Sequence, residues 1–171
     1  MTKYFFCTIG MLGLCPWAFG QSAEIYGFFA PGQLRASSEF GGASRFAMNM
    51  GGGGRYIHKS GLGAGFEIGA AGPKEGWADY NFGLLSMNGY YVFKNDHKVE
   101  PFVTGGYSRS FGWSGGDMDL NWGNFGAGLT YWASRRAGVL LEFRDNVCRP
   151  GGVTVQLWAM RAGITLRLGS F

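Results

Sequence analysis

The stretch VTVQLWAMRAGITLRLGSF, residues 153–171, decides the fold of this chain. Its even positions from 158 to 168 carry Trp158, Met160, Ala162, Ile164, Leu166 and Leu168. The odd positions between them carry Ala159, Arg161, Gly163, Thr165 and Arg167. Because side chains alternate across a β-strand, this pattern predicts a strand with one apolar face and one small or basic face. A tilted strand of about eleven residues crosses the hydrocarbon layer of a bilayer, so this strand is long enough to span a membrane.

Seven earlier segments repeat the alternation, and we expect strands over residues 24–30, 46–58, 62–70, 80–93, 99–111, 122–132 and 137–147. Tight turns are expected at 59–60, 95–97 and 135–136, and longer loops at 31–44, 72–78, 113–119 and 148–152. An even strand count with alternating short and long connections is typical of membrane barrels with short periplasmic turns and longer outer loops. The sequence therefore predicts an all-β fold, a closed antiparallel eight-stranded up-and-down transmembrane β-barrel. Both termini of the mature chain would lie on the periplasmic side.

The last strand also resembles the C-terminal assembly signal of bacterial outer-membrane β-barrels. That signal has a polar residue, a glycine two positions on, apolar residues three and five after the glycine, and a terminal aromatic, here Arg161, Gly163, Leu166, Leu168 and Phe171. Most of the remaining chain is similar to the small OmpA/OmpX type of barrel, including PFVTGGYSRS at 101–110 and LLEFRDNV at 140–147. The peptidoglycan-binding domain that OmpA-type proteins append is not expected here.

This resemblance implies a place in the cell outer membrane of a Gram-negative-type bacterium. Its implied partners are outer-membrane lipid and, during biogenesis, the barrel assembly machinery. The loops carry no readable motif, so the sequence does not indicate what they bind.

The composition limits the alternatives. The chain has 171 residues, 32 of them glycine, with 17% aromatic residues and 15% charged residues, against about 25% charged in a typical domain. No apolar run after residue 20 approaches the roughly 20 residues that a membrane helix needs. The formal net charge is +4, or +3 without Lys3 (14 basic minus 11 acidic residues), and no basic cluster exceeds Arg135–Arg136. We therefore expect no nucleic-acid partner.

Residues 1–20 are expected to form a signal peptide, leaving residues 21–171 as the barrel domain. Lys3 precedes an apolar stretch, and the small residues Ala18 and Gly20 indicate cleavage before Gln21. A retained anchor is disfavoured because the stretch is short and contains a proline, and a lipoprotein is disfavoured because Leu14 precedes Cys15. Cys148 is the one cysteine left in the mature chain, so no intramolecular disulfide is possible.

Charged side chains are expected inside the barrel. Seven fall on predicted inward faces, namely Glu24, Arg55, Glu67, Glu142, Arg144, Arg161 and Arg167. The interior of an eight-stranded barrel is only wide enough for side chains, which favours a salt-bridged plug over a conducting lumen.

The glycines of 51–54 and 61–69 match no phosphate-binding motif and are expected to allow close packing. Two aromatic girdles are expected, with Tyr56, Tyr91, Phe93, Tyr131 and Trp132 at one rim and Trp77, Tyr80, Phe111, Trp113 and Trp122 at the other.

Enzymatic, metal and cofactor sites are not expected. The two histidines, His58 and His97, fall at predicted periplasmic turns, whereas Ser37, Ser38 and Ser114 fall at the outer side, so acyl transfer by a Ser/His pair is disfavoured. Asp117 and Asp119 are too few ligands for a calcium loop. We expect a non-enzymatic outer-membrane protein with a structural or surface-interaction role. There are two alternatives. One is a narrow, porin-like solute channel, and the other is a soluble periplasmic barrel that binds an apolar ligand inside. Detergent dependence would distinguish the soluble barrel from the two membrane proteins.

Overall fold

The computed structural model describes residues 22–38, 41–95, 97–112 and 119–168, which form eight strands. The strands are β1 (Ser22–Ser38), β2 (Gly41–Ile57), β3 (Leu62–Pro73), β4 (Phe82–Val92), β5 (Val99–Gly112), β6 (Asn121–Trp132), β7 (Ala137–Cys148) and β8 (Thr154–Leu168). A four-residue helix α1 (Trp77–Tyr80) follows β3, and a 3-10 turn (Pro150–Gly152) follows β7. Within the described ranges, no helix has the length and apolarity that crossing a membrane requires.

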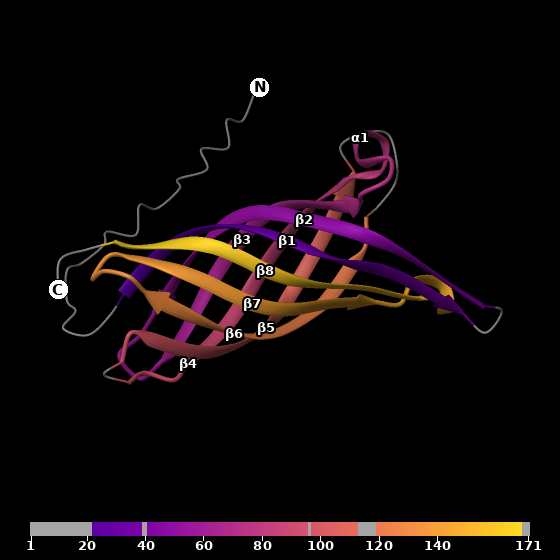
Figure 1. Ribbon diagram of the computed structural model, residues 1–171. Coiled ribbons are helices and arrows are strands. Elements are labelled where there is room, and N and C mark those ends of the chain that lie inside the picture. The colour runs from indigo at the N-terminus through magenta and orange to yellow at the C-terminus, as the bar shows by residue number, and fades with distance from the viewer. Residues whose placement is uncertain (1–21, 39–40, 96, 113–118, 169–171) are drawn as a thin grey trace, which may run out of the picture.

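Each strand pairs antiparallel with the next, and β8 pairs with β1 to close the sheet (Figure 1). The closing pair runs from Ala23 opposite Leu168 to Ser37 opposite Thr154. The predicted closed antiparallel eight-stranded barrel is confirmed, as are the alternating faces of the last strand.

The prediction of a loop at residues 31–44 is wrong. β1 and β2 have 17 residues each, and they remain paired from Ser22–Ile57 to Ser38–Gly41. Pro31 has no backbone N–H, but its effect is local, because the pairing of β1 with β8 skips only residues 30 and 31 and resumes at Gly32 in the same register. Pairing with both neighbouring strands therefore overrides the Gly, Pro and Ser content that suggested a loop. β3 and β7 also extend into two other expected loops, to Pro73 and Cys148 respectively.

The two ends of the barrel differ in their connections (Figure 1). One end, called here the terminal end, contains the start of β1, the end of β8 and the short connections β2–β3, β4–β5 and β6–β7. The other, called the distal end, contains the β1–β2 connection, α1 and the connections β5–β6 and β7–β8. The predicted alternation of short and long connections therefore holds only in part: the distal connections β3–β4 and β5–β6, of eight residues each, are longer than any terminal one, but only two residues separate β1 from β2 and five separate β7 from β8.

The outer face of the barrel is an apolar belt. Large side chains point outward from every strand and are exposed, among them Phe29, Met50, Phe66, Met87, Val103, Phe125, Leu141 and Ile164. Met87 and Ile164 are each 66% exposed. At the distal edge of the belt, the outward positions become polar, as Arg35, Ser44, Lys74 and Arg109 show.

The predicted aromatic girdles are partly wrong. Tyr56, Tyr91, Phe93 and Tyr131 are exposed at the terminal end as expected, but Trp132 and Trp122 point inward and are only 6% and 1% exposed. Both tryptophans occupy even positions of β6, the same face as Asn124 and Thr130, so the strand alternation requires them inside. Trp113 lies outside the described residues.

Candidate functional site

All seven charged residues proposed for the lumen point into the barrel, and ion pairs join them. Four form a central cluster in which two carboxylates alternate with two guanidinium groups. Arg161 Nη2 lies 2.7 Å from Glu67 Oε2 and Arg161 Nη1 lies 3.2 Å from Glu142 Oε2. Arg144 contacts the same two acids at 3.4 Å from Glu67 and 2.6 Å from Glu142. None of these four side chains is more than 4% exposed.

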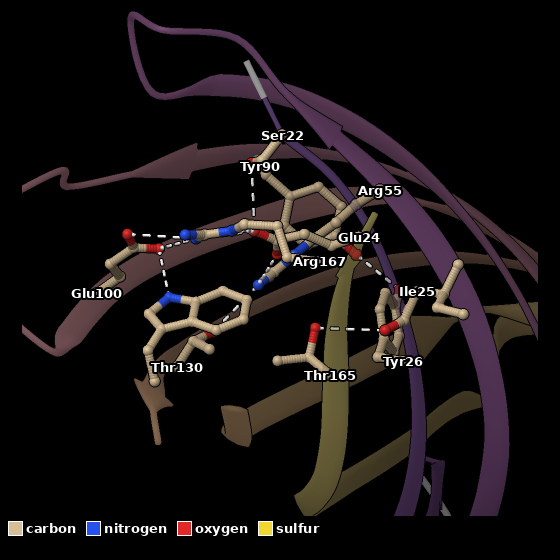
Figure 2. Close-up of polar contacts among 11 residues, drawn as sticks. Ser22, Glu24, Ile25, Tyr26, Arg55, Tyr90, Glu100, Thr130, Thr165 and Arg167 are labelled. Carbon is tan, nitrogen blue, oxygen red and sulfur yellow. Dashed lines mark hydrogen bonds and ion pairs between the residues drawn. The ribbon is translucent and has the colours of Figure 1, made fainter. Parts of the chain in front are cut away.

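A second cluster lies at the terminal end (Figure 2). Glu24 pairs with Arg55 at 2.8 Å and with Arg167 at 3.2 Å, and Arg167 also reaches Glu100 at 3.1 Å. Arg55 Nη2 donates a hydrogen bond to Thr130 Oγ1 at 3.0 Å. This cluster spans the interior from β1 and β2 to β5 and β6.

A pair of tyrosines joins the two clusters. The hydroxyl of Tyr26 donates a hydrogen bond to Glu67 Oε2 at 3.1 Å, and it also lies 3.1 Å from the hydroxyl of Tyr90. Arg55 lies over the ring of Tyr90, with its guanidinium carbon 5.4 Å from the ring centre. The buried charges are thus linked into one network through most of the interior.

Glu100 is the member that the sequence analysis missed. With it, the network holds four arginines and the four acids Glu24, Glu67, Glu100 and Glu142, so its formal charge is 4 − 4 = 0. The seven predicted residues alone carry one excess positive charge, and an unpaired charge in a buried space is energetically costly. That imbalance, together with the place of Glu100 on the polar face of β5, was the available signal.

Strand register explains some of these pairs. Glu24 stands directly opposite Arg55 and Arg167, and Glu142 stands opposite Arg161. Glu67 has no charged neighbour beside it, because Gly53 and Ser86 occupy the paired positions. Its carboxylate therefore pairs across the lumen.

Inward glycines provide the room for these side chains. A Cβ added at Gly126 would lie 3.0 Å from Glu142 Oε1, and one added at Gly65 would lie 2.9 Å from the ring of Tyr90. Gly163 stands against Phe28, and Arg161 stacks on the same ring with its guanidinium carbon 3.6 Å from the ring centre. Side chains at these glycines would displace the ionic network or the aromatic rings that support it.

An apolar layer that was not predicted from the sequence lies between this network and the distal end. Phe82 and Trp122 stack with their ring centres 6.2 Å apart and an interplanar angle of 5°. Leu84, Leu157 and Cys148 complete the cluster with two alanines, and all of these side chains are buried. The layer separates the charged groups from the distal surface.

The groups considered for catalysis lie far apart. His58 and His97 are at the terminal end, where Nδ1 of His58 contacts Ser60 Oγ of its own turn at 3.0 Å, whereas Ser37 is at the distal end. Asp119 forms an exposed ion pair with Arg109 at 3.0 Å. The part of the chain that the structure describes contains no group of three or more His, Cys, Asp or Glu side chains placed to bind a metal. Ser114 and Asp117 lie outside that part.

The residues of the proposed assembly signal are only partly described. Arg161 and Gly163 point inward, and Leu166 and Leu168 point outward and are 43% and 49% exposed. Phe171 and the expected signal peptide lie outside the described residues, so their roles stay predictions.

Comparisons with known proteins find likeness in structure alone. No family model matches the chain, and no curated protein matches its sequence. The crystal structure of Neisserial surface protein A (NspA) superposes with a TM-score of 0.64 at 16% identity, covering 88% of this chain and 100% of that one. A de novo designed transmembrane β-barrel gives a TM-score of 0.52 at 14% identity, covering 86% of this chain and 95% of that one. The outer membrane protein OprG from Pseudomonas aeruginosa gives 0.50 at 12% identity, covering 88% and 97%. At this level of identity the likeness concerns the fold, and the chain has the fold of small eight-stranded outer-membrane β-barrels.

Proposed function

We propose that this chain is an integral outer-membrane β-barrel protein of a Gram-negative-type bacterium. It has no enzymatic activity, and its role is structural or consists of surface contacts made through the connections at its distal end. The observation that carries this proposal is the distribution of polarity, with large apolar side chains outside and paired charges inside.

Lipid is the solvent that suits this distribution. Leaving a large apolar side chain in water instead of burying it costs about 1.5–3 kcal/mol, and the belt exposes such side chains on every strand. A closed barrel also pairs its backbone groups between strands, as the interior of a bilayer requires. Outer-membrane lipid is therefore the partner of the belt, and the barrel assembly machinery is the proposed partner of the C-terminal strand. Water on the belt would be unfavourable, which argues against the soluble periplasmic alternative.

Sidedness can be tested with engineered cysteines, because native Cys148 points into the apolar layer and is only 6% exposed. In a Cys148→Ala background, an impermeant thiol reagent added to intact cells should label Glu75→Cys, since Glu75 is exposed at the distal end. Lys59→Cys, exposed in the β2–β3 turn at the terminal end, is the matched control and should react only after the outer membrane is broken. Labelling of Lys59→Cys alone on intact cells would show the inverse topology. Recovery of both variants in the soluble periplasmic fraction would contradict the proposal.

The wild-type barrel should conduct little or no current across a planar bilayer. Paired charges fill the terminal and central parts of the lumen, and the Phe82–Trp122 layer lies beyond them. A larger porin reconstituted in the same way serves as the positive control. A steady, ion-selective current from the wild type that does not respond to changes at Glu142 or Arg161 would favour the channel.

A further inference from the structure

The distal end of the barrel holds an apolar cavity that does not belong to the ion-paired lumen. Its volume is about 380 Å³, within the roughly 300–1,000 Å³ range of small-molecule pockets. Leu34 and Ala36 of β1, Ala43 of β2 and Pro73 of β3 line it together with Phe82. Because Phe82 stacks on Trp122, the apolar layer beyond the ionic network also bounds this cavity.

Strand β1 gives the cavity part of its wall, because the polarity of its two faces reverses beyond the apolar belt. Outward positions of β1 change from Phe29 and Pro31 to Gln33 and Arg35, whereas the inward positions Leu34 and Ala36 are apolar. A polar outside and an apolar inside are the pattern of a protein segment in water. An apolar concavity in such a segment is unfavourable while it holds only water, and surfaces of this kind mark binding sites.

Two charged residues, Arg45 and Asp79, also line the cavity. Arg45 projects from β2 opposite Leu34, in a strand that pairing with β1 holds in place. No hydrogen bond or ion pair joins the side chain of Arg45 to another residue in the described part of the chain. Its planar guanidinium group presents a fork of donors that matches a carboxylate. Asp79 lies in the four-residue helix α1, outside the paired strands.

We propose that this cavity binds a fatty-acid-like ligand, an unbranched acyl chain that ends in a carboxylate. The chain lies between Leu34, Ala36 and Phe82, and the carboxylate pairs with Arg45. This inference goes beyond the proposed function. It depends on the walls of the cavity and not on which side of the membrane the distal end faces, so it can fail while the proposed function holds.

The inference can be tested by measuring decanoate binding to the barrel in lipid nanodiscs, which leave both ends of the barrel accessible. Empty nanodiscs give the baseline for partition of decanoate into lipid. Equilibrium dialysis should show saturable binding to the wild type above that baseline. Arg45→Gln should weaken it about tenfold, the size expected for a lost hydrogen-bonded charge pair. Ala36→Trp should abolish it by filling the cavity. Decanol, with the same chain and no charge, should bind more weakly and should not respond to Arg45→Gln.

Matched controls come from neighbouring residues of β1 that face away from the cavity. Arg35→Gln removes a nearby arginine, and Ser37→Trp adds the same bulk on the outer side, so both should bind decanoate like the wild type. Heat-modifiable gel mobility checks that every variant is folded. Asp79→Asn should tighten binding, because it removes a negative charge beside the carboxylate.

Three results would overturn the inference. Equal binding by wild type and Ala36→Trp would show partition into lipid only. Decylammonium that binds more tightly than decanoate, is weakened by Asp79→Asn and does not respond to Arg45→Gln would show that the site prefers a cationic head group. Binding that appears only after residues 113–118 are replaced by a Gly-Ser linker would show that the chain's own loop occupies the cavity.

Discussion

Deleting Phe171, or changing Leu166 and Leu168 to Asp, is expected to block insertion of the barrel and leave the protein aggregated in the periplasm. Both leucines lie on the outer face of β8 and are exposed there. A charge facing lipid at the midplane costs roughly 2–4 kcal/mol for basic residues and less for acidic ones. This cost alone would weaken the barrel without preventing its assembly. Loss of recognition of the C-terminal strand should therefore be the larger effect.

A matched substitution separates these two causes. Ile25 stands opposite Leu166 in the β1–β8 pair and is 44% exposed, against 43% for Leu166. Ile25→Asp therefore places a carboxylate at the same depth but outside the proposed signal, and it should retain much more outer-membrane protein than Leu166→Asp. Membrane fractionation and heat-modifiable gel mobility measure both. Normal outer-membrane levels of the Phe171 deletion would show that the proposed C-terminal signal is not needed for insertion.

Glu142→Ala should lower the free energy of unfolding by about 3–5 kcal/mol, the usual loss when one partner of a buried ion pair is removed. The substitution takes a carboxylate from both Arg144 and Arg161, which are 3% and 1% exposed. Each arginine would keep only Glu67 as an acidic partner. Unfolding in urea, followed by tryptophan fluorescence in a fixed detergent, gives the measurement.

Asp119→Ala is the surface control, because its pair with Arg109 is about 60% exposed on both sides, and such pairs contribute about 0–1 kcal/mol. Removing Arg144 together with Glu142 should cost less than the sum of the two single changes, since it restores neutrality in the cluster. Equal losses for Glu142→Ala and Asp119→Ala would mean that the interior charges are solvated, as in an open lumen.

Period-two alternation made most of the fold predictable. It assigned Leu166 to the outer face and Arg161 to the inner face, and glycines such as Gly65 and Gly126 to the crowded interior. The same rule, applied strictly, would also have placed Trp122 and Trp132 inside, but their aromatic character near strand ends suggested girdles instead. The end of β1 was missed because local Gly, Pro and Ser content does not report pairing with strands that are distant in sequence.

The partners within the site were less predictable. Pairs such as Glu24–Arg167 follow from register, because β1 and β8 must meet for the barrel to close. Glu67 instead meets Arg161, 94 residues away, across the interior, and no periodic pattern encodes a contact through the lumen. The apolar layer and the distal cavity depend in the same way on which side chains reach one another at one level of the barrel.

The junction between β1 and β8 has a consequence for how the chain folds. Contacts there join residues about 140 positions apart, as between Thr165 and Ile25 or Arg167 and Glu24. Such contacts form only when nearly the whole chain is available, and non-local pairing of this kind slows folding. Until the junction forms, β1 and β8 each present an unpaired edge that can recruit another chain. The step that completes the sheet is thus also the step that ends exposure to aggregation, and the Glu24–Arg167 pair forms with it.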